Sequence, residues 1–278
     1  MKKALFLSLI IFGSFLSADA LMNAVLSDER DPKNVLRDDA RNPYETLSFF
    51  LITDEMEVIE LSPGGGWYTE ILANYLHKSG GLIAAHFDKD TTSNYLKKIR
   101  KNFEKKMNSN SIYQNVEIVN LTSKLSEPNS VDAVLTFRNL HNWLGPMMDN
   151  IFANSYEALK PGGIFGVVEH RAKPGTSLQE MKRTGYVTEQ YAVEEAEKHG
   201  FILFAKSEIN ANSKDTKHYS KGVWTLPPTL RLKEKNKEIN VIRQRRKEDQ
   251  RREDWAEAVS LCGFCGRILV PQRFAFII

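Results

Sequence analysis

The stretch FRNLHNWLG, residues 137–145, carries a cation, a titratable imidazole and two side-chain amides as close neighbours: Arg138, His141, Asn139 and Asn142. A guanidinium binds anions, an amide orients a ligand through hydrogen bonds, and an imidazole exchanges a proton near neutral pH. The stretch directly follows an apolar run, and in open α/β sheets ligands bind beyond the ends of the strands. These residue types could therefore bind a substrate and remove a proton from it.

A second apolar run, which begins at Gly163, ends in the polar residues Glu169, His170 and Arg171. If both runs are parallel strands, their ends lie at the same edge of a sheet, and His170 falls on the same rim as His141. Both histidines are therefore candidate proton acceptors. A histidine after a strand is also a common structural hydrogen-bonding residue, so the structural interpretation stays open.

The residues VIELSPGGGWYTEIL, 58–72, pass from an apolar run through three glycines into an amphipathic helical pattern. Glycines let the backbone approach a ligand without an intervening Cβ, and both dinucleotides and S-adenosylmethionine bind at such turns. The dinucleotide fingerprint G-x-G-x-x-G needs a glycine inside the start of the helix. Here the glycines are bunched at residues 64–66 and Trp67 follows them. The spacing therefore favours S-adenosylmethionine over a dinucleotide.

Two acids accompany this glycine loop. Glu60 ends the apolar run before it, and Asp88 ends the next apolar run, at the interval of about 20 residues expected of a ribose-binding carboxylate. A carboxylate there can accept hydrogen bonds from both ribose hydroxyls. The sequence LKPGG, Leu159–Gly163, precedes a later apolar run. The loop, the spaced acid and LKPGG together are a much stronger signal than the loop alone.

Apolar strand-like runs alternate with amphipathic helical patterns along most of the chain. The expected strands are residues 57–61, 81–88, 115–120, 131–137, 163–170 and 201–209. The expected helices are residues 67–80, 91–107, 147–160 and 188–200. Such alternation predicts an α/β fold of the Rossmann-like kind, with a mostly parallel, doubly wound sheet and helices on both faces.

With these motifs in place, the sequence resembles the class I S-adenosylmethionine-dependent methyltransferases. LKPGG occurs in many of their subfamilies and supports only the superfamily. A closer resemblance is to an exported bacterial subgroup of predicted methyltransferases, and it is carried by RDDARNPYETL, PGGGWYTEIL, AAHFD, FRNLHNW and GVWTLPP. The resemblance runs from about Asp28 to Leu230.

The resemblance implies S-adenosylmethionine as cofactor and assigns roles to single positions. The glycine loop would meet the methionine part of the cofactor, with Glu60 bracing the loop, while Asp88 would hold the ribose. Asn120 stands where many members have an aspartate near adenine, and Ser62 replaces their commoner first glycine. The expected cofactor-binding residues are Glu60, Pro63, Gly64, Gly65, Gly66, Asp88 and Asn120.

The resemblance also implies an enzyme that transfers a methyl group to an acceptor. Because the cofactor already activates the methyl group, the protein must position the acceptor and take its proton. The expected catalytic residues are Arg138, Asn139, His141 and His170. The alternative is a non-catalytic exported protein that binds S-adenosylmethionine or another adenosine-containing ligand. No His, Asp or Glu spacing indicates a metal site.

Composition and charge narrow the class of partner. Hydrophobic residues make up 42% and charged residues 26% of the chain, as in ordinary globular proteins. The formal net charge is +3, and the basic excess lies after Arg231, so the main domain is nearly neutral. A neutral domain argues against binding a phosphate backbone, so we expect a small-molecule acceptor rather than a nucleic acid, with lipid and protein acceptors left open. The basic run 97–106 is predicted to be a solvated helix face rather than a nucleic-acid or membrane patch.

The first twenty residues have the pattern of a cleaved secretory signal. Two lysines precede an apolar run from Ala4 to Leu16, and Ala18 and Ala20 have the small-x-small spacing of a cleavage site. Cleavage near Ala20 would place the protein in the periplasm or outside the cell. The alternative is a retained anchor helix, but the apolar run is short of the roughly 20 residues that span a bilayer.

The predicted organisation has four parts: a signal peptide (1–20), a helical cap (21–52), the S-adenosylmethionine-binding domain (53–230) and a charged extension (231–278). Cys262 and Cys265 in the extension are predicted to form a local disulfide or to remain free thiols. The last residues, 272–278, could supply a final strand, antiparallel at or near the edge of the sheet. Otherwise the extension is an altered terminus, and the sheet lacks its closing strand.

Overall fold

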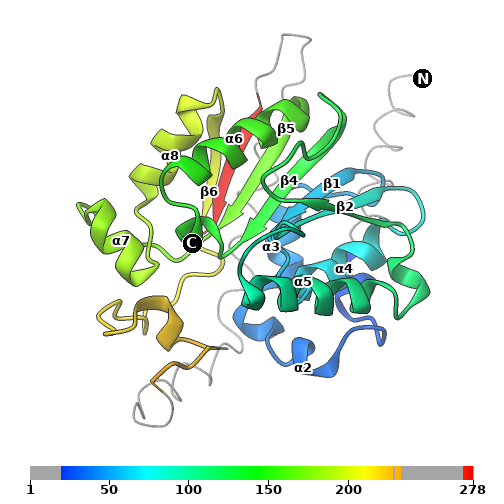
Figure 1. Ribbon diagram of the computed structural model, residues 1–278, viewed down its shortest axis with the longest axis horizontal. Coiled ribbons are helices and arrows are strands. Elements are labelled where there is room, and N and C mark those ends of the chain that lie inside the picture. Colours follow the sequence, from blue (N-terminus) through cyan, green and yellow to red (C-terminus); the bar gives the residue numbers. More distant parts are fainter. Residues whose placement is uncertain (1–19, 228, 233–271, 278) are drawn as a thin grey trace, which may run out of the picture.

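A computed structural model of the chain describes residues 20–227, 229–232 and 272–277, and Figure 1 shows their arrangement. The strands form one seven-stranded sheet of order β3-β2-β1-β4-β5-β7-β6. Every pairing in this sheet is parallel. The strands are β1 (Glu57–Leu61), β2 (Gly81–His86), β3 (Val116–Asn120), β4 (Val131–Phe137), β5 (Leu159–Val168), β6 (Ile202–Ser207) and β7 (Arg273–Ile277). The predicted α/β fold with a doubly wound sheet is confirmed.

Helices connect and flank these strands. The α-helices are α2 (Pro32–Val35), α3 (Pro43–Phe49), α4 (Trp67–Leu76), α5 (Asn94–Met107), α6 (Pro146–Ala158), α7 (Leu178–Thr184) and α8 (Glu189–Lys198). The 3-10 helices are η1 (Asp38–Ala40), η2 (Ser111–Tyr113), η3 (Leu140–Asn142) and η4 (Gly222–Thr225). Local sequence sets their starts: the hydroxyls of Ser93 and Thr188 accept backbone N–H groups in the first turns of α5 and α8.

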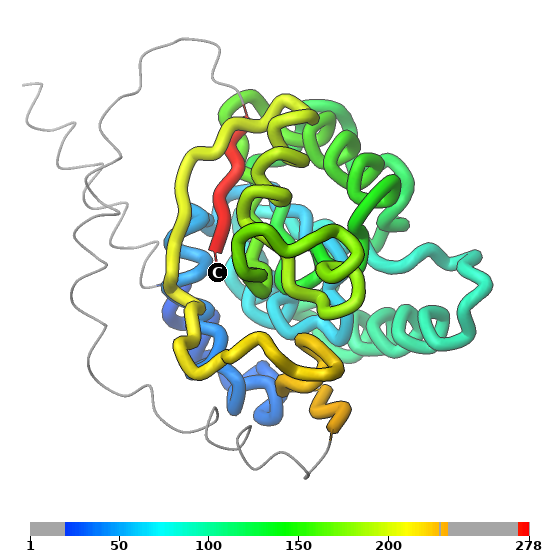
Figure 2. Tube along the Cα trace, turned by 90° about the vertical axis from the view of Figure 1, so that its left-hand side faces the viewer, coloured from blue at the N-terminus to red at the C-terminus, as the bar shows by residue number. Residues whose placement is uncertain are grey.

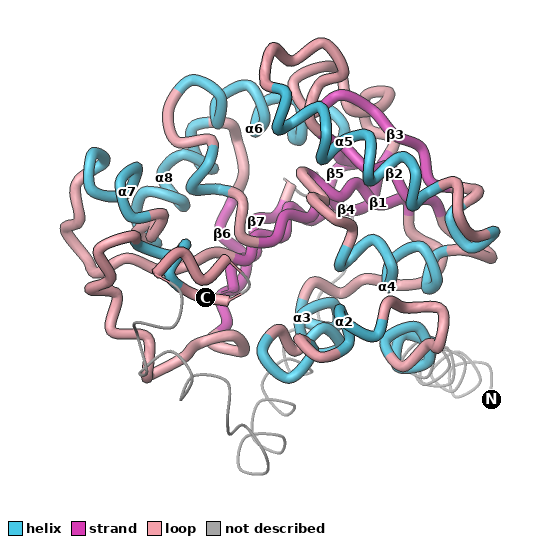
Figure 3. The backbone as a smooth tube through the Cα atoms, turned by 60° about the horizontal axis from the view of Figure 1, so that its bottom comes forward, coloured by secondary structure: helices cyan, strands magenta, loops and turns pink. Residues whose placement is uncertain are grey.

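Apolar side chains lie on both faces of the sheet, so each face needs a helical cover. Val58 belongs to a core with α4, α5 and the N-terminal segment, whereas its neighbour Ile59 belongs to a core with α6 and α8. Figure 1 shows these helix groups on opposite sides of the sheet. In Figure 3, α2 and α3 lie on the same side as α4. Phe50, at the end of α3, packs where a Cβ on Gly166 of β5 would stand.

The prediction that the last strand is antiparallel at or near the edge is wrong. β7 pairs in parallel with both β5 and β6 and lies between them, as the red strand beside the yellow one shows in Figure 2. Its phenylalanines and its other apolar residues alternate between the two cores, so both faces are buried. A short strand that is apolar on both faces gives no periodic signal for its direction or its position in the sheet.

LKPGG also differs from its predicted place. The sequence was expected to precede the fifth strand, but β5 begins at Leu159. Val131 pairs with Leu159 and Ala133 pairs with Ile164, so the residues between them on β5 form a bulge. Proline has no N–H for a ladder and glycine tolerates irregular backbone, so this composition suits a bulge.

Several predictions concern residues that the structure does not describe. The signal peptide up to Asp19, the charged run 233–271 and both cysteines lie outside the described residues. Ala20 is described and begins a helical turn in which Leu21, Ala24 and Val25 are buried. Within the described parts of the chain, every helix is too short or too polar to cross a membrane.

The strand order also locates the place where a ligand would bind. The chain runs from β1 outward to β2 and β3, and then returns to place β4 on the other side of β1. At such a reversal the connections leave in opposite directions, and a crevice opens beyond the carboxyl ends of the strands. By this rule the crevice is expected beyond Leu61 of β1 and Phe137 of β4, where the glycine loop and FRNLHNWLG begin.

Candidate active site

Asn139 ties the two sides of the crevice together. Its side-chain amide lies 3.4 Å and 3.2 Å from the carbonyl oxygens of Leu61 and Ser62. It also lies 3.2 Å from the carbonyl oxygen of Phe137 and 3.3 Å from the hydroxyl of Thr136. The NH2 group of Asn139 is therefore directed at the scaffold, and Asn139 positions the start of the glycine loop.

The glycine loop has a left-handed backbone at three positions. The φ angles are 52° at Ser62, 61° at Gly64 and 77° at Gly66, a region that favours glycine over residues with a Cβ. A Cβ added to Gly64 or Gly65 would meet no atom within 4 Å. The middle of the loop therefore presents bare backbone to open space.

Glu60 lies beneath the loop and is buried, with 2% of its surface exposed. Its carboxylate accepts a hydrogen bond of 2.6 Å from the hydroxyl of Thr69 in the first turn of α4. Burial raises the pKa of Glu60 to about 7, against the opposing effects of that hydrogen bond and of Lys106 and Arg41. Glu60 braces the loop against α4 and can change its charge near neutral pH.

His86, the last residue of β2, supports the loop from the neighbouring strand. Its Nε2 lies 3.0 Å from the carbonyl oxygen of Gly64, and the N–H of Phe87 donates to its Nδ1 at 2.8 Å. Burial lowers the pKa of His86 to about 4, so the ring is neutral at pH 7. Because Nδ1 accepts the hydrogen bond from Phe87, the ring hydrogen is on Nε2, which donates to the carbonyl oxygen of Gly64.

Lys106 of α5 reaches the loop from outside. Its Nζ donates to the carbonyl oxygens of Gly65 and Gly66 at 3.0 Å and 3.1 Å, and it pairs with Glu70 at 2.6 Å. This residue and the buried Arg100 both belong to the basic run 97–106, so part of that run faces inward. Arg100 and Phe103 on the same helix are buried, and their spacing with Lys106 is the signal that could have identified it.

Asp88 and Asn120 lie at the β2 and β3 side of the crevice. Asp88 follows the end of β2 by two residues, and its carboxylate accepts from the backbone N–H and the hydroxyl of Thr122. The side-chain oxygen of Asn120 lies 3.3 Å from the N–H of Lys89. A carboxylate oxygen can accept more than one hydrogen bond, so Asp88 retains capacity for a ligand hydroxyl.

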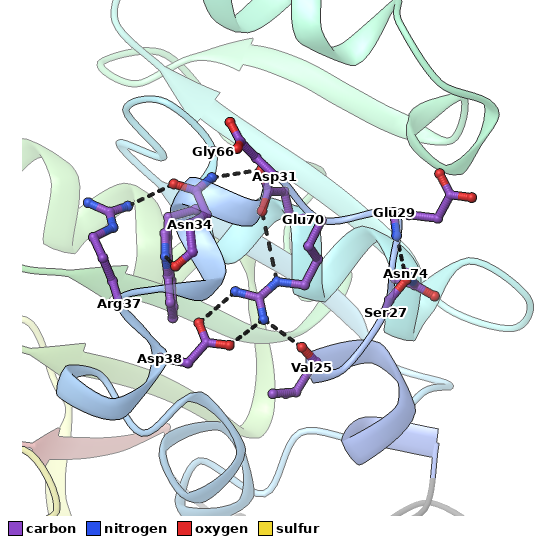
Figure 4. A network of polar contacts seen from close by, with 12 residues as sticks. Val25, Ser27, Glu29, Asp31, Asn34, Arg37, Asp38, Gly66, Glu70 and Asn74 are labelled. Carbon is purple, nitrogen blue, oxygen red and sulfur yellow. Dashed lines mark hydrogen bonds and ion pairs between the residues drawn. The ribbon is translucent and has the colours of Figure 1, made fainter. Parts of the chain in front are cut away.

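The N-terminal segment, residues 20–52, packs against α4 beside the loop (Figure 4). Arg30 donates to both carboxylate oxygens of Asp38 at 2.6 Å and 2.8 Å and to the carbonyl oxygen of Val25. The amide of Asn34 donates to Glu70 at 2.7 Å, and the indole of Trp67 donates to the carbonyl oxygen of Asn34. These contacts hold the segment over the start of α4.

His141 and Glu169 form a buried pair across the two strand ends. The Nδ1 of His141 lies 3.0 Å from each carboxylate oxygen, and the N–H of His141 donates to the same carboxylate at 3.0 Å. The N–H of His170 also donates to Glu169, at 2.7 Å. The side chains of His141 and Glu169 are 6% and 0% exposed. This is the arrangement in which a carboxylate orients an imidazole for proton transfer.

The pKa values of this pair move apart. Burial alone would lower the pKa of His141, but the charge and hydrogen bond of Glu169 outweigh it and raise that pKa. Burial alone would raise the pKa of Glu169, but His141 and His170 hold it below its usual value. Glu169 therefore stays ionised, and His141 takes up a proton more readily than a free histidine does.

His170 is in a different state. Burial, with the nearby positive charge of Arg138 second, lowers the pKa of His170 to about 3. Its ring centre lies 6.4 Å from that of His141 and 6.0 Å from that of Tyr186. Trp224 of η4, in the GVWTLPP segment, stands 5.8 Å from His141. The rings of His170 and Trp224 thus flank His141, and His170 is a neutral neighbour rather than a cation.

Arg138 occupies the turn between β4 and η3. Its φ of 63° is unusual for a residue with a long side chain, and such strain costs roughly 1–3 kcal/mol. The backbone N–H of Arg138 donates to Val168 at 2.7 Å, which fixes the turn. Its guanidinium lies 3.3 Å from the carbonyl oxygen of Ala40 in the N-terminal segment. The strained turn directs Arg138 toward that segment.

The sequence-predicted residues thus gather along one edge of the sheet. Glu60, Asp88, Asn120 and the loop 63–66 lie at the ends of β1, β2 and β3, and the catalytic candidates follow β4 and β5. Sequence reasoning noted Glu169 only as a neighbour and missed His86 and Lys106. The sequence does not indicate that Glu169 pairs with His141, because that contact joins residues that follow two different strands.

Comparison with known families agrees with this geometry. Residues 59–167 match the family model described as a methyltransferase domain. The matched range starts in β1 and ends in β5, so it includes the glycine loop, Asp88, Asn120 and FRNLHNWLG. No curated protein matches the sequence.

Many solved structures are similar to the chain, and two of them serve as examples. One is an S-adenosylmethionine-dependent methyltransferase from Aquifex aeolicus, with 17% identity, a TM-score of 0.48 and coverage of 63% of this chain and 85% of that one. The other is a putative methyltransferase from Bacillus halodurans, with 17% identity, a TM-score of 0.44 and coverage of 59% and 70%. The assignment of a methyltransferase domain therefore rests on the family match and on the arrangement of the site, not on these structures.

The residues at the crevice fit S-adenosylmethionine. The open space over Gly64 and Gly65 lets the amino-acid part of such a ligand approach the loop backbone closely. The hydroxyl of Ser62 is buried and has no hydrogen-bond partner within the described residues. A buried polar atom without a partner is costly, and a polar ligand group would remove that cost.

Proposed function

We propose that this protein, whose residues 59–167 are a class I S-adenosylmethionine-dependent methyltransferase domain, transfers a methyl group to an oxygen or nitrogen of a small-molecule acceptor. The observation that carries the proposal is the buried His141 and Glu169 pair beside the crevice. A protein that only bound the cofactor would not need an imidazole held by a carboxylate at this edge. Acceptors with an O–H or N–H do need a group that takes their proton.

S-adenosylmethionine is the cofactor, and when bound it supplies a methyl group on a positively charged sulfur. The glycine loop, braced by Glu60, would hold its amino-acid part, and Asp88 would bind its ribose hydroxyls. Asn139 and His86 fix the loop, through its carbonyl groups at Ser62 and Gly64. Most of the work of these residues is orientation, because the methyl group is already activated.

His141 takes the acceptor proton. Its Nδ1–H donates to Glu169, which leaves the neutral Nε2 to accept a proton. The proton that the acceptor loses on methylation would pass to Nε2, and the Glu169 carboxylate would stabilise the imidazolium. The cofactor would supply the methyl group from its sulfonium and leave as S-adenosylhomocysteine. His170 stays neutral and can accept or donate a hydrogen bond to the acceptor.

Gly65→Val tests the cofactor site. The residue does not have a left-handed backbone and its Cβ would enter open space, so the variant should fold with the thermal stability of the wild type. The added side chain would stand where the ligand approaches, and affinity for S-adenosylmethionine by calorimetric titration should fall at least about tenfold. Unchanged affinity, or equal wild-type affinity for NAD, would contradict the proposed site.

His141→Asn tests catalysis separately from binding. Wild-type protein incubated with S-adenosylmethionine and fractions of a small-molecule extract should produce S-adenosylhomocysteine. The variant should bind the cofactor normally and produce S-adenosylhomocysteine at most at about a hundredth of the wild-type rate, the usual size of a lost general base. A wild type that binds the cofactor and never turns over would indicate a non-catalytic binding protein.

A further inference from the structure

Three arginines from two separate parts of the chain meet beside the candidate active site. Arg37 and Arg41 belong to the N-terminal segment, and their guanidinium groups lie 5.8 Å and 4.6 Å from the ring centre of Trp67. Arg138, from the turn after β4, reaches the same segment at Ala40. We call these residues, Arg37, Arg41 and Arg138, the arginine triad.

Within the described ranges, the arginine triad has no carboxylate partner. Arg30 also lies over Trp67, at 5.3 Å, but it is paired with Asp38 at 2.6 Å and lies 3.8 Å from Glu70. No Asp or Glu oxygen of residues 20–227, 229–232 or 272–277 lies within 4.0 Å of the triad. The acid nearest in sequence, Asp38, is thus used by Arg30.

The hydrogen-bonding groups of the triad are incompletely used. The Nε of Arg37 is buried without a partner in the described structure, although its Nη2 donates to Asn34 at 3.1 Å, a contact visible in Figure 4. The Arg138 side chain donates to Ala40 over a long distance of 3.3 Å. All three residues are partly exposed, so the triad borders the surface of the described structure.

The three cations repel one another. Burial, followed by repulsion from Arg138 and Arg37, lowers the pKa of Arg41 to about 9, which still leaves it charged at pH 7. Burial and then the charge of Arg138 lower the pKa of Arg37. Nearby acids, such as Asp38 for Arg37 and Arg41 and Glu169 for Arg138, oppose this effect only from beyond ion-pair distance. An anion bound directly to the triad would relieve the remaining repulsion.

The cofactor as a whole does not bring a net negative charge to the triad. S-adenosylmethionine has one carboxylate, but its sulfonium and ammonium groups give it a net positive charge at pH 7. Its binding therefore adds to the positive charge near the triad. A guanidinium forms paired hydrogen bonds to planar or tetrahedral oxyanions, and several together favour a carboxylate or phosphate with more than one oxygen.

We propose that Arg37, Arg41 and Arg138 bind a carboxylate or phosphate group of the methyl acceptor. This inference rests on the proposed function, because it places the anion of the acceptor beside His141. Arg138 adjoins the FRNLHNWLG segment and Arg41 lies over Trp67 at the start of α4, so the anion would bind between the N-terminal segment and the base. The acceptor is then a small anionic molecule.

The test uses inorganic phosphate and succinate as probes. Each is titrated calorimetrically, at constant ionic strength, into the full chain alone and into its complex with S-adenosylhomocysteine, which fills the cofactor's carboxylate site. We expect one or both probes to bind the complex, and Arg41→Gln and Arg138→Gln each to weaken that binding about tenfold or more. Arg183→Gln, which removes an exposed arginine paired with Glu180, should leave it unchanged.

Folding is controlled by thermal unfolding and by Arg41→Lys, which keeps the charge over Trp67 and should retain part of the binding. Failure of both probes to bind the wild-type complex would overturn the inference. A loss of S-adenosylhomocysteine affinity in the arginine variants, without loss of affinity for 5′-methylthioadenosine, would assign the triad to the cofactor's carboxylate and overturn it as well. Failure of the wild type to bind S-adenosylhomocysteine would refute the proposed function. In that case the titrations of the free chain with phosphate and succinate still test whether the arginine triad binds an anion.

Discussion

At the scale of single residues, the chemistry of this site depends on buried groups whose charge is set by one neighbour. Glu169 fixes both the orientation and the proton affinity of His141, through contacts of 3.0 Å. Glu60 has no paired imidazole, and burial raises its pKa, which favours the neutral form. Glu169 and Glu60 therefore differ in charge at neutral pH, and the protonation of each site can be tested by a substitution.

Glu169→Gln should lower the pKa of His141. Burial is the largest effect on this histidine and acts to lower its pKa, so removing the carboxylate leaves burial unopposed. The pKa of His141, measured by NMR titration of its ring, should then fall below its ordinary value, with the signal assigned by comparison with His141→Asn. An unchanged titration would mean that Glu169 does not control this group.

Glu60→Gln should change stability in a pH-dependent way. The pKa of Glu60 is raised by burial to about 7, so from pH 4.5 to pH 7 the unfolded chain loses this proton first, and stability falls as pH rises. The glutamine side chain has no such proton, so the variant should gain stability over the wild type at pH 8, by up to about 3 kcal/mol, and little at pH 4.

Urea unfolding of the ligand-free proteins at both pH values measures this difference. Glu157→Gln, an exposed glutamate on α6, is the matched control and should show no such difference. Equal stability of Glu60→Gln and the wild type at pH 8 would show that Glu60 is ionised in the folded protein at little cost.

At the scale of elements, α5 is both a cover for the sheet and a support for the glycine loop. Lys106→Met removes the donor to Gly65 and Gly66 and leaves Glu70, whose side chain is 1% exposed, short of its closest cation. Unfolding by urea should show a loss of roughly 1–3 kcal/mol, the usual cost of a buried polar group that loses a partner.

Lys105→Met, on the exposed side of the same helix, is the control and should cost less than about 0.5 kcal/mol. Adding Glu70→Gln to Lys106→Met should recover part of the stability, because the uncompensated charge is then gone. If the two lysine variants lose equal stability, Lys106 is not a support of the loop.

The elements could be predicted from the sequence wherever periodicity and glycine spacing are local signals. The strands that end in Leu61 and Phe137 and the helix after Gly66 follow from such signals. The direction of β7 could not be predicted, because its apolar residues fit either direction equally well. The contacts of Glu169, His86 and Lys106 join separate elements, and no spacing along the chain encodes them.

At the scale of the whole molecule, the N-terminal segment contributes both to the core and to the arginine triad. Leu21 and Ala24 are each 2% exposed and belong to the core that includes α4. A chain that starts at Leu21 would retain both groups of contacts. Cleavage of the proposed signal peptide after Ala20 is therefore compatible with the described fold, and cleavage a few residues later would remove buried side chains.

We propose that the mature protein begins at Leu21 and works outside the cytosol. Expression of the full chain in a bacterial host, followed by fractionation and N-terminal sequencing, should find protein that starts at Leu21 in the periplasm. Ala18→Leu should slow processing, because a signal peptidase site needs small residues at this spacing. Cytosolic protein with an intact Met1 would refute export and would place the methyl transfer where the cofactor is made. Export instead requires that S-adenosylmethionine reach the protein after translocation, or bind it before.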